Sequence, residues 1–366
     1  MQNNVFYKDV FTIADANAYL DGAIRGLMKD LLFVSISKPL SLFKFLSFSF
    51  KQRKVAVKRK AFAEKGIPVP PFVIASIANT CNLTCKGCYA SVNQKNCSDM
   101  LTSLQWNNIF SEASALGVSF MLLAGGEPLI RFEVIESASK HGNIIFPVFT
   151  NGLLIDDNII RFLNGNRNIV PVLSLEGDEI LTDARRGAGT YLKLNLIMQK
   201  LKKNRIFFGV SITVTAENLQ DVTSDEFAAW LSSNGSGVAF YIEYVPVNDI
   251  SGFSAFGGEE RSTLESRVMG LNNRFKTLFI SFPGDEKLAG GCLASGRGFV
   301  HINPSGGLEP CPFSPYSDVT LKDSTLAEAL KSPFLNTLRD SGLLTSPHIG
   351  GCILWDRKTE VEAMIR

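Results

Sequence analysis

The sequence predicts an α/β fold, a partial (β/α)6 TIM-like barrel with an N-terminal helical segment and a small C-terminal extension. Short apolar runs alternate with helical patterns, as expected for buried parallel strands joined by helices. Polar or glycine-rich motifs follow these runs, where such barrels carry their functional residues. The predicted strands cover 72–77, 120–124, 144–149, 169–175, 207–213 and 238–245. The predicted helices cover 103–116, 132–140, 158–163, 189–203, 224–233 and 259–275.

The length and composition are those of one large α/β domain with an appendage. The chain has 366 residues and a formal net charge of +2, so no global field favours nucleic acid as a partner. Its 27 phenylalanines indicate a well-filled core and suit an apolar substrate surface. There are seven cysteines and no secretory signal, so we expect a reducing cytoplasm in which cysteines are more often metal ligands than disulfides.

Residues 1–70 differ in character from the rest of the chain. An amphipathic helical pattern over 15–30 precedes an apolar run over 31–50, in which Lys38, Pro39 and Lys44 argue against a membrane span. Residues 51–60 then carry six basic side chains and no acid. Two interpretations stay open: a helical collar packed on the barrel, or peripheral contact of residues 31–60 with an anionic membrane. Pro68, Pro70 and Pro71 mark the predicted boundary with the barrel, 71–283.

The first predicted strand ends in a loop with three cysteines. Cys81, Cys85 and Cys88 have the spacing Cys-x3-Cys-x2-Cys, without the paired fourth cysteine of a typical zinc site. Three thiolates on one tight loop suit a four-iron cluster that leaves one iron open to another ligand. The alternative, three buried thiols without a chemical role, does not explain such clustering.

This loop and its flanks resemble those of the radical S-adenosylmethionine (radical SAM) enzymes. The resemblance implies that the open iron binds the amino and carboxylate groups of S-adenosylmethionine. It also implies reductive cleavage to a 5′-deoxyadenosyl radical that abstracts a substrate hydrogen. A reductant such as ferredoxin or flavodoxin would supply the electron. One position departs from the family: Gly87 stands where an aromatic residue usually precedes the third cysteine, and Tyr89 follows it.

Motifs at the other strand ends add candidate residues for binding S-adenosylmethionine. Gly125-Gly126-Glu127 resembles the family motif that binds the amino group, although a glycine pair alone is also typical of a tight bend. Arg186, with its neighbour Arg185, could pair with the cofactor carboxylate or be a solvated charge. The predicted cofactor-binding residues are Gly125, Gly126, Glu127, Thr150, Asn151, Ser174, Glu176, Arg186, Ser211, Thr213 and Tyr244.

The C-terminal segment, 284–366, contains a second set of cysteines. Cys292 precedes a predicted hairpin around the turn at 304–307, and Cys311 follows it. This arrangement resembles the SPASM or twitch domains of radical SAM enzymes and implies one auxiliary four-iron cluster with Cys352 as third ligand. His301, His348 or Cys97 could supply a fourth ligand, or the position could be open for substrate. Three isolated structural cysteines are the alternative. Short helices are predicted over 325–332, 333–339 and 356–365.

We therefore expect a radical SAM enzyme with an auxiliary cluster for electron transfer or substrate binding. The substrate could be a small metabolite, a lipid or a peptide. A peptide-modifying maturase and a non-catalytic iron–sulfur electron-transfer protein are the alternative functions. Asp178, Glu243, Tyr244 and Arg297 are candidates for the substrate pocket.

Overall fold

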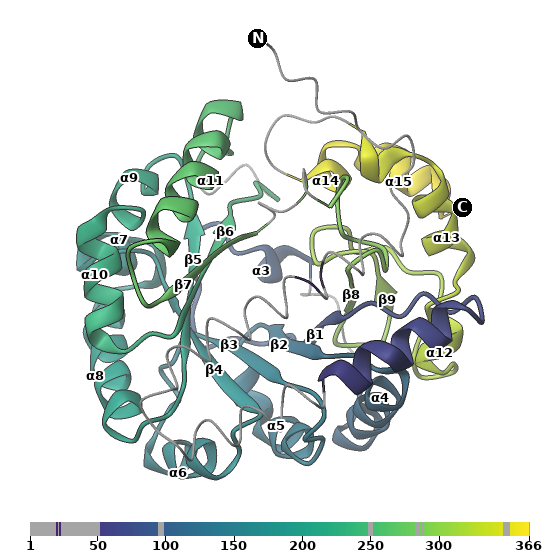
Figure 1. Ribbon diagram of the computed structural model, residues 1–366, viewed down its shortest axis with the longest axis horizontal. Helices are drawn as coiled ribbons and strands as arrows, with labels where there is room; N and C mark the ends of the chain where they lie inside the picture. The colour runs from purple at the N-terminus through teal and green to yellow at the C-terminus, as the bar shows by residue number, and fades with distance from the viewer. Residues whose placement is uncertain are drawn as a thin grey trace.

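The computed structural model describes residues 20, 22, 52–93, 99–247, 252–282, 286, 289–346 and 352–365. Within them, strands form a curved inner layer and helices cover its outer side (Figure 1). The nine strands form one sheet in the order β7-β6-β5-β4-β3-β2-β1-β8-β9, in which every neighbouring pair is parallel except β8 and β9. The strands are β1 (Phe72–Ala78), β2 (Phe120–Gly125), β3 (Phe146–Thr150), β4 (Ile169–Leu175), β5 (Gly209–Val214), β6 (Val238–Glu243), β7 (Leu278–Phe282), β8 (Phe299–Ile302) and β9 (Leu308–Glu309).

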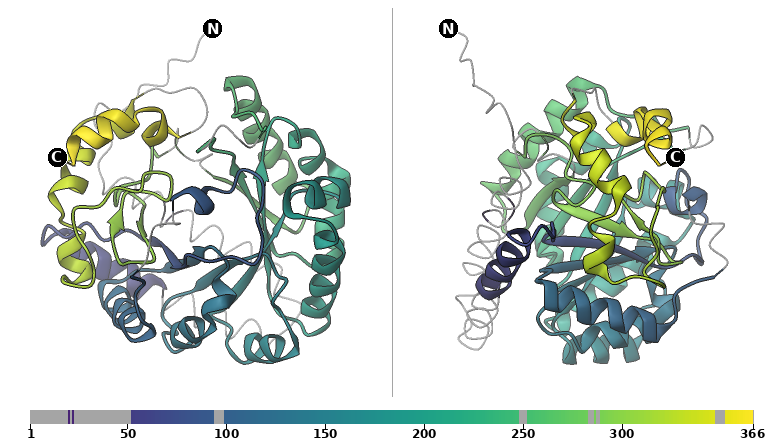
Figure 2. Two further views of the ribbon diagram at one scale, coloured as in Figure 1. Left: turned by 180° about the vertical axis from the view of Figure 1, so that it is seen from behind. Right: turned by 90° about the vertical axis from the view of Figure 1, so that its right-hand side faces the viewer.

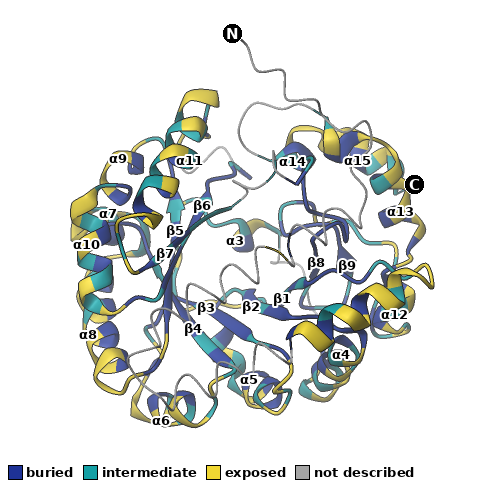
Figure 3. Cartoon of the chain, in the orientation of Figure 1, coloured by how far each residue is buried: buried dark blue, intermediate teal, exposed yellow. Residues whose placement is uncertain are grey.

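The predicted α/β barrel is confirmed, with a seventh parallel strand, β7, beyond the predicted six. The outer helices in the barrel region are α4 (Ser103–Leu116), α5 (Phe132–Ser139), α6 (Asp157–Gly165), α7 (Glu179–Arg186), α8 (Thr190–Lys203), α9 (Leu219–Val222), α10 (Asp225–Asn234) and α11 (Gly258–Asn272). Their inner faces pack on one face of the strands, and their outer faces are exposed (Figure 3). Alternation along the strands leaves the other face of the sheet for the concave interior.

Aromatic side chains meet across this concave side. Phe149 of β3 and Phe240 of β6 have ring centroids 5.6 Å apart, although two strands separate them in the sheet. Phe282 of β7 and Phe299 of β8 are also 5.6 Å apart, from strands at opposite ends of the barrel sheet. Such pairs can meet only because the sheet curls, so the second pair links the two sides of the incomplete barrel.

The predicted helices omit one helix of the barrel region. Residues 182–187 lie outside every predicted helix, but they lie in and just after α7. The Asp178 carboxylate accepts a hydrogen bond from the Leu181 amide at 2.9 Å and thereby caps the start of this helix. Gly187, with a φ of 108°, ends it. A helix of eight residues with a strongly polar sequence has too weak an apolar pattern to be predicted from periodicity.

The C-terminal segment continues the barrel sheet. The predicted hairpin is confirmed as β8 and β9, and β8 pairs parallel to β1 with Ile74 opposite His301. Beside the hairpin lie α12 (Leu326–Ala329), α13 (Pro333–Asp340), α14 (Ile353–Asp356) and α15 (Lys358–Met364), which both views in Figure 2 place at the outer side. The predicted helix over 356–365 corresponds to α15, and the short helix α14 precedes it.

Residues 52–63 form a helix that packs beside α4. Arg59 is buried and donates hydrogen bonds to the Gly117 carbonyl at 2.5 Å and to Ser119 Oγ at 2.8 Å. Arg53, Lys54 and Lys58 are exposed. Most of the predicted N-terminal helix and all of the apolar run over 31–50 lie outside the described residues. Within the described part of the chain, no helix has both the length and the hydrophobicity needed to cross a membrane.

Candidate active site

The three-cysteine loop follows β1, at the edge of the barrel where the parallel strands end. Cys81 is exposed, and Cys85 and Cys88 are half-buried. The thiols are close enough that Cys85 and Cys88 both act electrostatically on Cys81. Burial raises the pKa of Cys85, while the charges of Arg186 and Arg185 oppose that rise. Cations beside a thiol favour the thiolate, which is the form that binds iron.

The Gly125-Gly126-Glu127 turn is joined to the backbone that enters this loop. The Gly126 amide donates to the Ala78 carbonyl at 2.7 Å, and the Glu127 amide donates to the Thr80 carbonyl at 2.8 Å. A Cβ atom on Gly126 would lie 2.0 Å from the Thr80 carbonyl oxygen. The glycines are therefore required for close contact between two backbone segments, and this contact fixes the position of the cysteine loop.

The Glu127 side chain is buried and connects the ends of β2 and β3. Its carboxylate accepts hydrogen bonds from Thr150 Oγ1 at 2.7 Å, from the Asn151 amide at 2.8 Å and from the Leu129 amide at 3.0 Å. Asn151 in turn donates to Asn82 Oδ1 at 2.7 Å and lies 3.8 Å from Cys81 Sγ. Burial raises the pKa of Glu127, although these hydrogen bonds act against the rise. Thr150 and Asn151 thus support the cysteine loop through Glu127.

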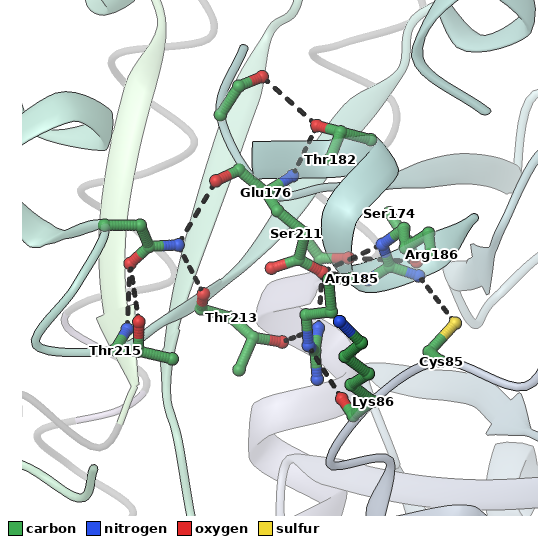
Figure 4. Close-up of polar contacts among 12 residues, drawn as sticks. Cys85, Lys86, Ser174, Glu176, Thr182, Arg185, Arg186, Ser211, Thr213 and Thr215 are labelled. Carbon is green, nitrogen blue, oxygen red and sulfur yellow. Dashed lines mark hydrogen bonds and ion pairs between the residues drawn. The ribbon is translucent and has the colours of Figure 1, made fainter. Parts of the chain in front are cut away.

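Two arginines and one carboxylate form the opposite side of the site (Figure 4). Glu176 follows β4, is 2% exposed, and pairs through Oε1 with both Arg185 and Arg186. Arg186 Nη1 lies 4.0 Å from Cys85 Sγ, and the Arg185 side chain donates to the Lys86 carbonyl at 3.1 Å. These contacts connect α7 to the cysteine loop.

The second carboxylate oxygen of Glu176 is a buried polar atom without a hydrogen-bond partner among the described residues. Such atoms in native structures usually have a partner, so an unpartnered one beside a predicted ligand site fits a hydrogen-bond donor from that ligand. The backbone at this position is fixed, because Asn218 Nδ2 donates to the Glu176 carbonyl at 3.2 Å and the Glu176 amide donates to Thr182 Oγ1 at 3.2 Å.

Neighbouring hydroxyls continue this edge. Ser174 of β4 and Ser211 of β5 are opposite each other in the sheet, with their hydroxyl oxygens 3.5 Å apart. Thr213 Oγ1 accepts a hydrogen bond from Arg185 at 2.9 Å. Ser174 and Thr213 are half-buried, so their hydroxyls remain accessible at the same edge as the cysteine loop. The structure therefore brings together all but one of the predicted cofactor-binding residues.

Tyr244 is the exception, because its side chain is not accessible at this edge. Its side chain is 1% exposed and packs edge-to-face on Phe253, with ring centroids 5.8 Å apart. Three predicted pocket residues are also engaged elsewhere. Asp178 caps α7, the buried Glu243 pairs with Arg261 at 3.0 Å, and Arg297 binds backbone carbonyls near Cys292.

The departure at Gly87 has a structural reason. Gly87 has a φ of 66°, a left-handed conformation that favours glycine over an aromatic residue. Tyr89, in the short helix α3 (Tyr89–Asn93), packs edge-to-face on Phe313 with ring centroids 5.1 Å apart. Asn93 Nδ2 also donates to the Pro312 carbonyl at 2.9 Å. Helix α3 therefore connects the cysteine loop to the segment just after Cys311.

A second group of thiols consists of Cys292, Cys311 and Cys352, although the first and the last are 60 positions apart in the sequence. The charges of Cys352 and Cys292 both act on Cys311. Burial raises the pKa of Cys292 and of Cys311. Among the described residues, no three acidic, histidine or cysteine side chains are arranged to hold a single ion. The ligands of a four-iron cluster bind different irons, so the donor chemistry of both thiol groups remains suited to a cluster.

Residues 75–227 match the Radical SAM superfamily. The chain is 27% identical over 177 residues to the mycofactocin maturase MftC of Mycobacterium tuberculosis, covering 47% of this chain and 44% of MftC. It is 24% identical over 285 residues to the AdoMet-dependent heme synthase of Methanosarcina barkeri, covering 71% and 81%. The fold is similar to Streptococcus suis SuiB bound to its precursor peptide SuiA, with a TM-score of 0.64 at 16% identity, covering 82% and 71%.

The barrel fold, the cysteine loop and the match of residues 75–227 together indicate a barrel protein that binds an iron–sulfur cluster. The part of the chain that matches the Radical SAM superfamily is the barrel segment 75–227. A domain of this family implies a four-iron cluster and S-adenosylmethionine as cofactors. The chain nevertheless spans less than half the length of the M. tuberculosis MftC that it matches.

Proposed function

We propose that this protein is a radical SAM enzyme with an auxiliary four-iron cluster. When bound, the first cluster and S-adenosylmethionine supply reductive cleavage to a 5′-deoxyadenosyl radical, which abstracts a hydrogen atom from the substrate. The observation that carries the proposal is the arrangement of the three-cysteine loop, the Gly125-Gly126-Glu127 turn and the Arg186–Glu176 pair at one edge of the barrel.

The chain's own residues would hold and orient the cofactors. Cys81, Cys85 and Cys88 would bind the cluster, and Glu127 would keep the loop in place through Thr150 and Asn151. Arg186 is the cation nearest Cys85 and would pair with the cofactor carboxylate. Ser174, Ser211, Thr213 and the second oxygen of Glu176 would serve the ribose hydroxyls.

Anaerobic reconstitution tests this function. The reconstituted protein, reduced with dithionite in the presence of S-adenosylmethionine, should form 5′-deoxyadenosine, and a ferredoxin or flavodoxin should replace dithionite. The Cys85→Ala variant should form none. A reducible cluster that yields no 5′-deoxyadenosine would support the non-catalytic electron-transfer alternative instead.

We propose that Cys292, Cys311 and Cys352 bind the auxiliary cluster. Their mutual contacts support this assignment, and their burial favours electron storage over direct substrate binding. The auxiliary site is attached to the barrel by α3 and by the pairing of β8 with β1. Iron and sulfide analysis should give about eight irons per chain, the sum for two four-iron clusters. About four irons would remove the auxiliary cluster from the proposal.

The substrate is expected to bind at the concave side of the barrel, beside Phe149 and Phe240, which favour an apolar group. Relatives named as maturases and the peptide-bound SuiB support a peptide, whereas the relative named as a heme synthase supports a small molecule. Incubation with a short peptide encoded beside the gene, followed by mass spectrometry, tests the first substrate. An unchanged peptide mass, with a porphyrin substrate consumed, would favour the second.

We also propose a cytoplasmic location, with peripheral membrane contact through residues 31–60 as a secondary function of the N-terminal segment. Val57 is 69% exposed between exposed basic residues, as in helices that lie on anionic surfaces. The wild type should sediment with anionic vesicles, and a variant with Arg53, Lys54 and Lys58 replaced by Gln should sediment less. Equal sedimentation would support the alternative, a collar packed on the barrel as Arg59 is.

A further inference from the structure

The fourth position of the auxiliary site has three predicted protein candidates. His348 and Cys97 lie outside the described residues. His301 is engaged through both ring nitrogens, because Nε2 lies 2.8 Å from Ser76 Oγ and Nδ1 lies 2.6 Å from Glu309 Oε2. His301 therefore has no ring nitrogen left for iron.

The hydroxyl of Ser314 is a polar group at this site that was not predicted. Ser314 is 1% exposed, and its Oγ has no hydrogen-bond partner among the described residues. Both of its backbone groups are paired, since its amide donates to the Cys311 carbonyl at 2.9 Å and its carbonyl accepts from the Tyr316 amide at 2.9 Å. Buried hydroxyls in native structures usually have a partner, so this one indicates a group that binds beside it.

A tight turn places the Ser314 side chain on the same face as that of Cys311. The turn runs from Cys311 to Ser314 and has Pro312 at its second position, where proline is favoured. Cys311 and Ser314 pair as an antiparallel bridge. Residues directly opposite each other in such a pair have Cβ atoms about 4.5–5.5 Å apart on one face. The hydroxyl is therefore within reach of the Cys311 sulfur and of a sulfide bound beside it.

Helix α3 holds this turn in place. Asn93 Nδ2 donates to the Pro312 carbonyl at 2.9 Å, and Tyr89 packs edge-to-face on Phe313 with ring centroids 5.1 Å apart. These contacts engage both central residues of the turn. The position of the Ser314 hydroxyl relative to Cys311 is therefore set by contacts within the protein.

We propose that the Ser314 hydroxyl donates a hydrogen bond to a sulfur of the auxiliary cluster at Cys311 and thereby raises the reduction potential of that cluster. This inference rests on the proposed function, because it requires the auxiliary cluster to exist. One-electron reduction makes the sulfurs more negative, so the hydrogen bond is stronger in the reduced form and favours it. Burial acts in the opposite direction, because an enclosed site disfavours added charge. The hydroxyl thus allows an enclosed cluster to accept an electron at a less negative potential.

The test uses the full chain with Cys81, Cys85 and Cys88 replaced by Ala, so that iron analysis and spectroscopy report only the auxiliary site. This parent should hold about four irons per chain. Anaerobic titration with dithionite, followed by electron paramagnetic resonance of the reduced cluster, gives its midpoint potential. Ser314→Ala in the parent should keep the iron content and lower that potential. At the midpoint of the parent, the ratio of reduced to oxidised cluster should fall about fivefold, as expected for the loss of one hydrogen bond.

Ser295→Ala in the same parent is the matched control. Ser295 also lies three residues after a cysteine, Cys292, and is 0% exposed, but its hydroxyl already donates to the Leu335 carbonyl at 3.1 Å. This variant should have the potential of the parent. Pulsed electron paramagnetic resonance after exchange into D2O gives a second measurement. The coupling of one exchangeable deuteron should be present in the parent and in Ser295→Ala, and missing in Ser314→Ala.

The outcomes distinguish the two proposals. A parent without iron overturns the auxiliary cluster and, with it, the role of Ser314. A parent with about four irons, whose potential and deuteron coupling are both unchanged by Ser314→Ala, overturns the role of Ser314 alone. Less iron in Ser314→Ala than in the parent also overturns it, because a donor to sulfur is not needed to hold iron. An equal shift of the potential in Ser295→Ala does so as well, because any buried serine would then have the same effect.

Discussion

The two cysteine groups differ in exposure and in neighbouring charge. Cys81 is exposed and lies on a loop beside two arginines, whereas Cys292 and Cys311 are 7% and 4% exposed. Cations beside an exposed loop suit a cluster that must accept an exchangeable ligand through the carboxylate of that ligand. An enclosed site suits a cluster that keeps its ligands and passes electrons. We therefore expect the two four-iron clusters to have different tasks, although their cysteine ligands are the same.

Single cysteine replacements should show the largest functional difference between the two cysteine groups. Cys85→Ala should abolish 5′-deoxyadenosine formation, because no cluster would bind the cofactor. Cys311→Ala should leave that formation in place while the chain loses about four irons and substrate turnover. Chromatographic assay of 5′-deoxyadenosine, with iron analysis, measures both. If Cys311→Ala also abolished cleavage, the two sites would not be independent.

Removing the carboxylate shared by the arginines should have the next largest effect. Glu176→Ala leaves Arg185 and Arg186, each 10% exposed in its side chain, without their buried partner. Breaking such a buried pair costs about 3–5 kcal/mol of unfolding free energy. Urea unfolding of the metal-free chain measures it. Asp157→Asn, which breaks the exposed pair with Lys200, is the control and should leave the midpoint unchanged. Equal midpoints for all three chains would contradict the expected role of burial.

A methyl group at the glycine turn should have a smaller effect on stability and a clear effect on iron binding. Gly126→Ala places a Cβ atom against the Thr80 carbonyl and should cost about 1–3 kcal/mol, as overpacking does. The displaced cysteine loop should also hold less iron. Gly142→Ala, where an added Cβ meets no atom within 4 Å, is the control for iron content and thermal stability. Full iron loading of Gly126→Ala would show that the loop tolerates displacement.

The smallest effect on the free energy of unfolding should come from replacing Tyr316, in the C-terminal segment. Burial and the hydrogen bond to Glu362 raise the pKa of Tyr316 to about 12 from an ordinary value of 10.0. Since the folded-state pKa is the higher one, this group's stabilisation is present below pH 10 and is lost as pH rises through about 12. Tyr316→Phe should cost about 1 kcal/mol at neutral pH. Urea unfolding should show the difference shrinking within that pH window, and a constant difference would contradict the sign.

The barrel and the cysteine loop could be predicted because their signals are local. Apolar runs mark β1 to β6, and the spacing of Cys81, Cys85 and Cys88 places three donors on one loop without any knowledge of packing. The predicted strand ends also place Glu176 and the serines at one edge, since parallel strands end on the same side of a sheet.

The remaining features depend on contacts between distant segments. No local pattern shows that Glu127 points toward Thr150 and Asn151, because that direction follows from the backbone contact with residues 78–80. Arg185 was predicted, with Arg186, to pair with the cofactor carboxylate or to be solvated, but no local pattern showed its contacts with Glu176, Thr213 and Lys86.

The pairing of β8 with β1 also affects how the chain is made. One edge of β1, residues 72–75, pairs with residues 299–302 of β8. That partner is synthesised after all the other barrel strands. Until then β1 has an unpaired edge, a recognised template for aggregation. Contacts of such long sequence separation form slowly, so the nascent barrel should depend on chaperones until its C-terminal hairpin has left the ribosome.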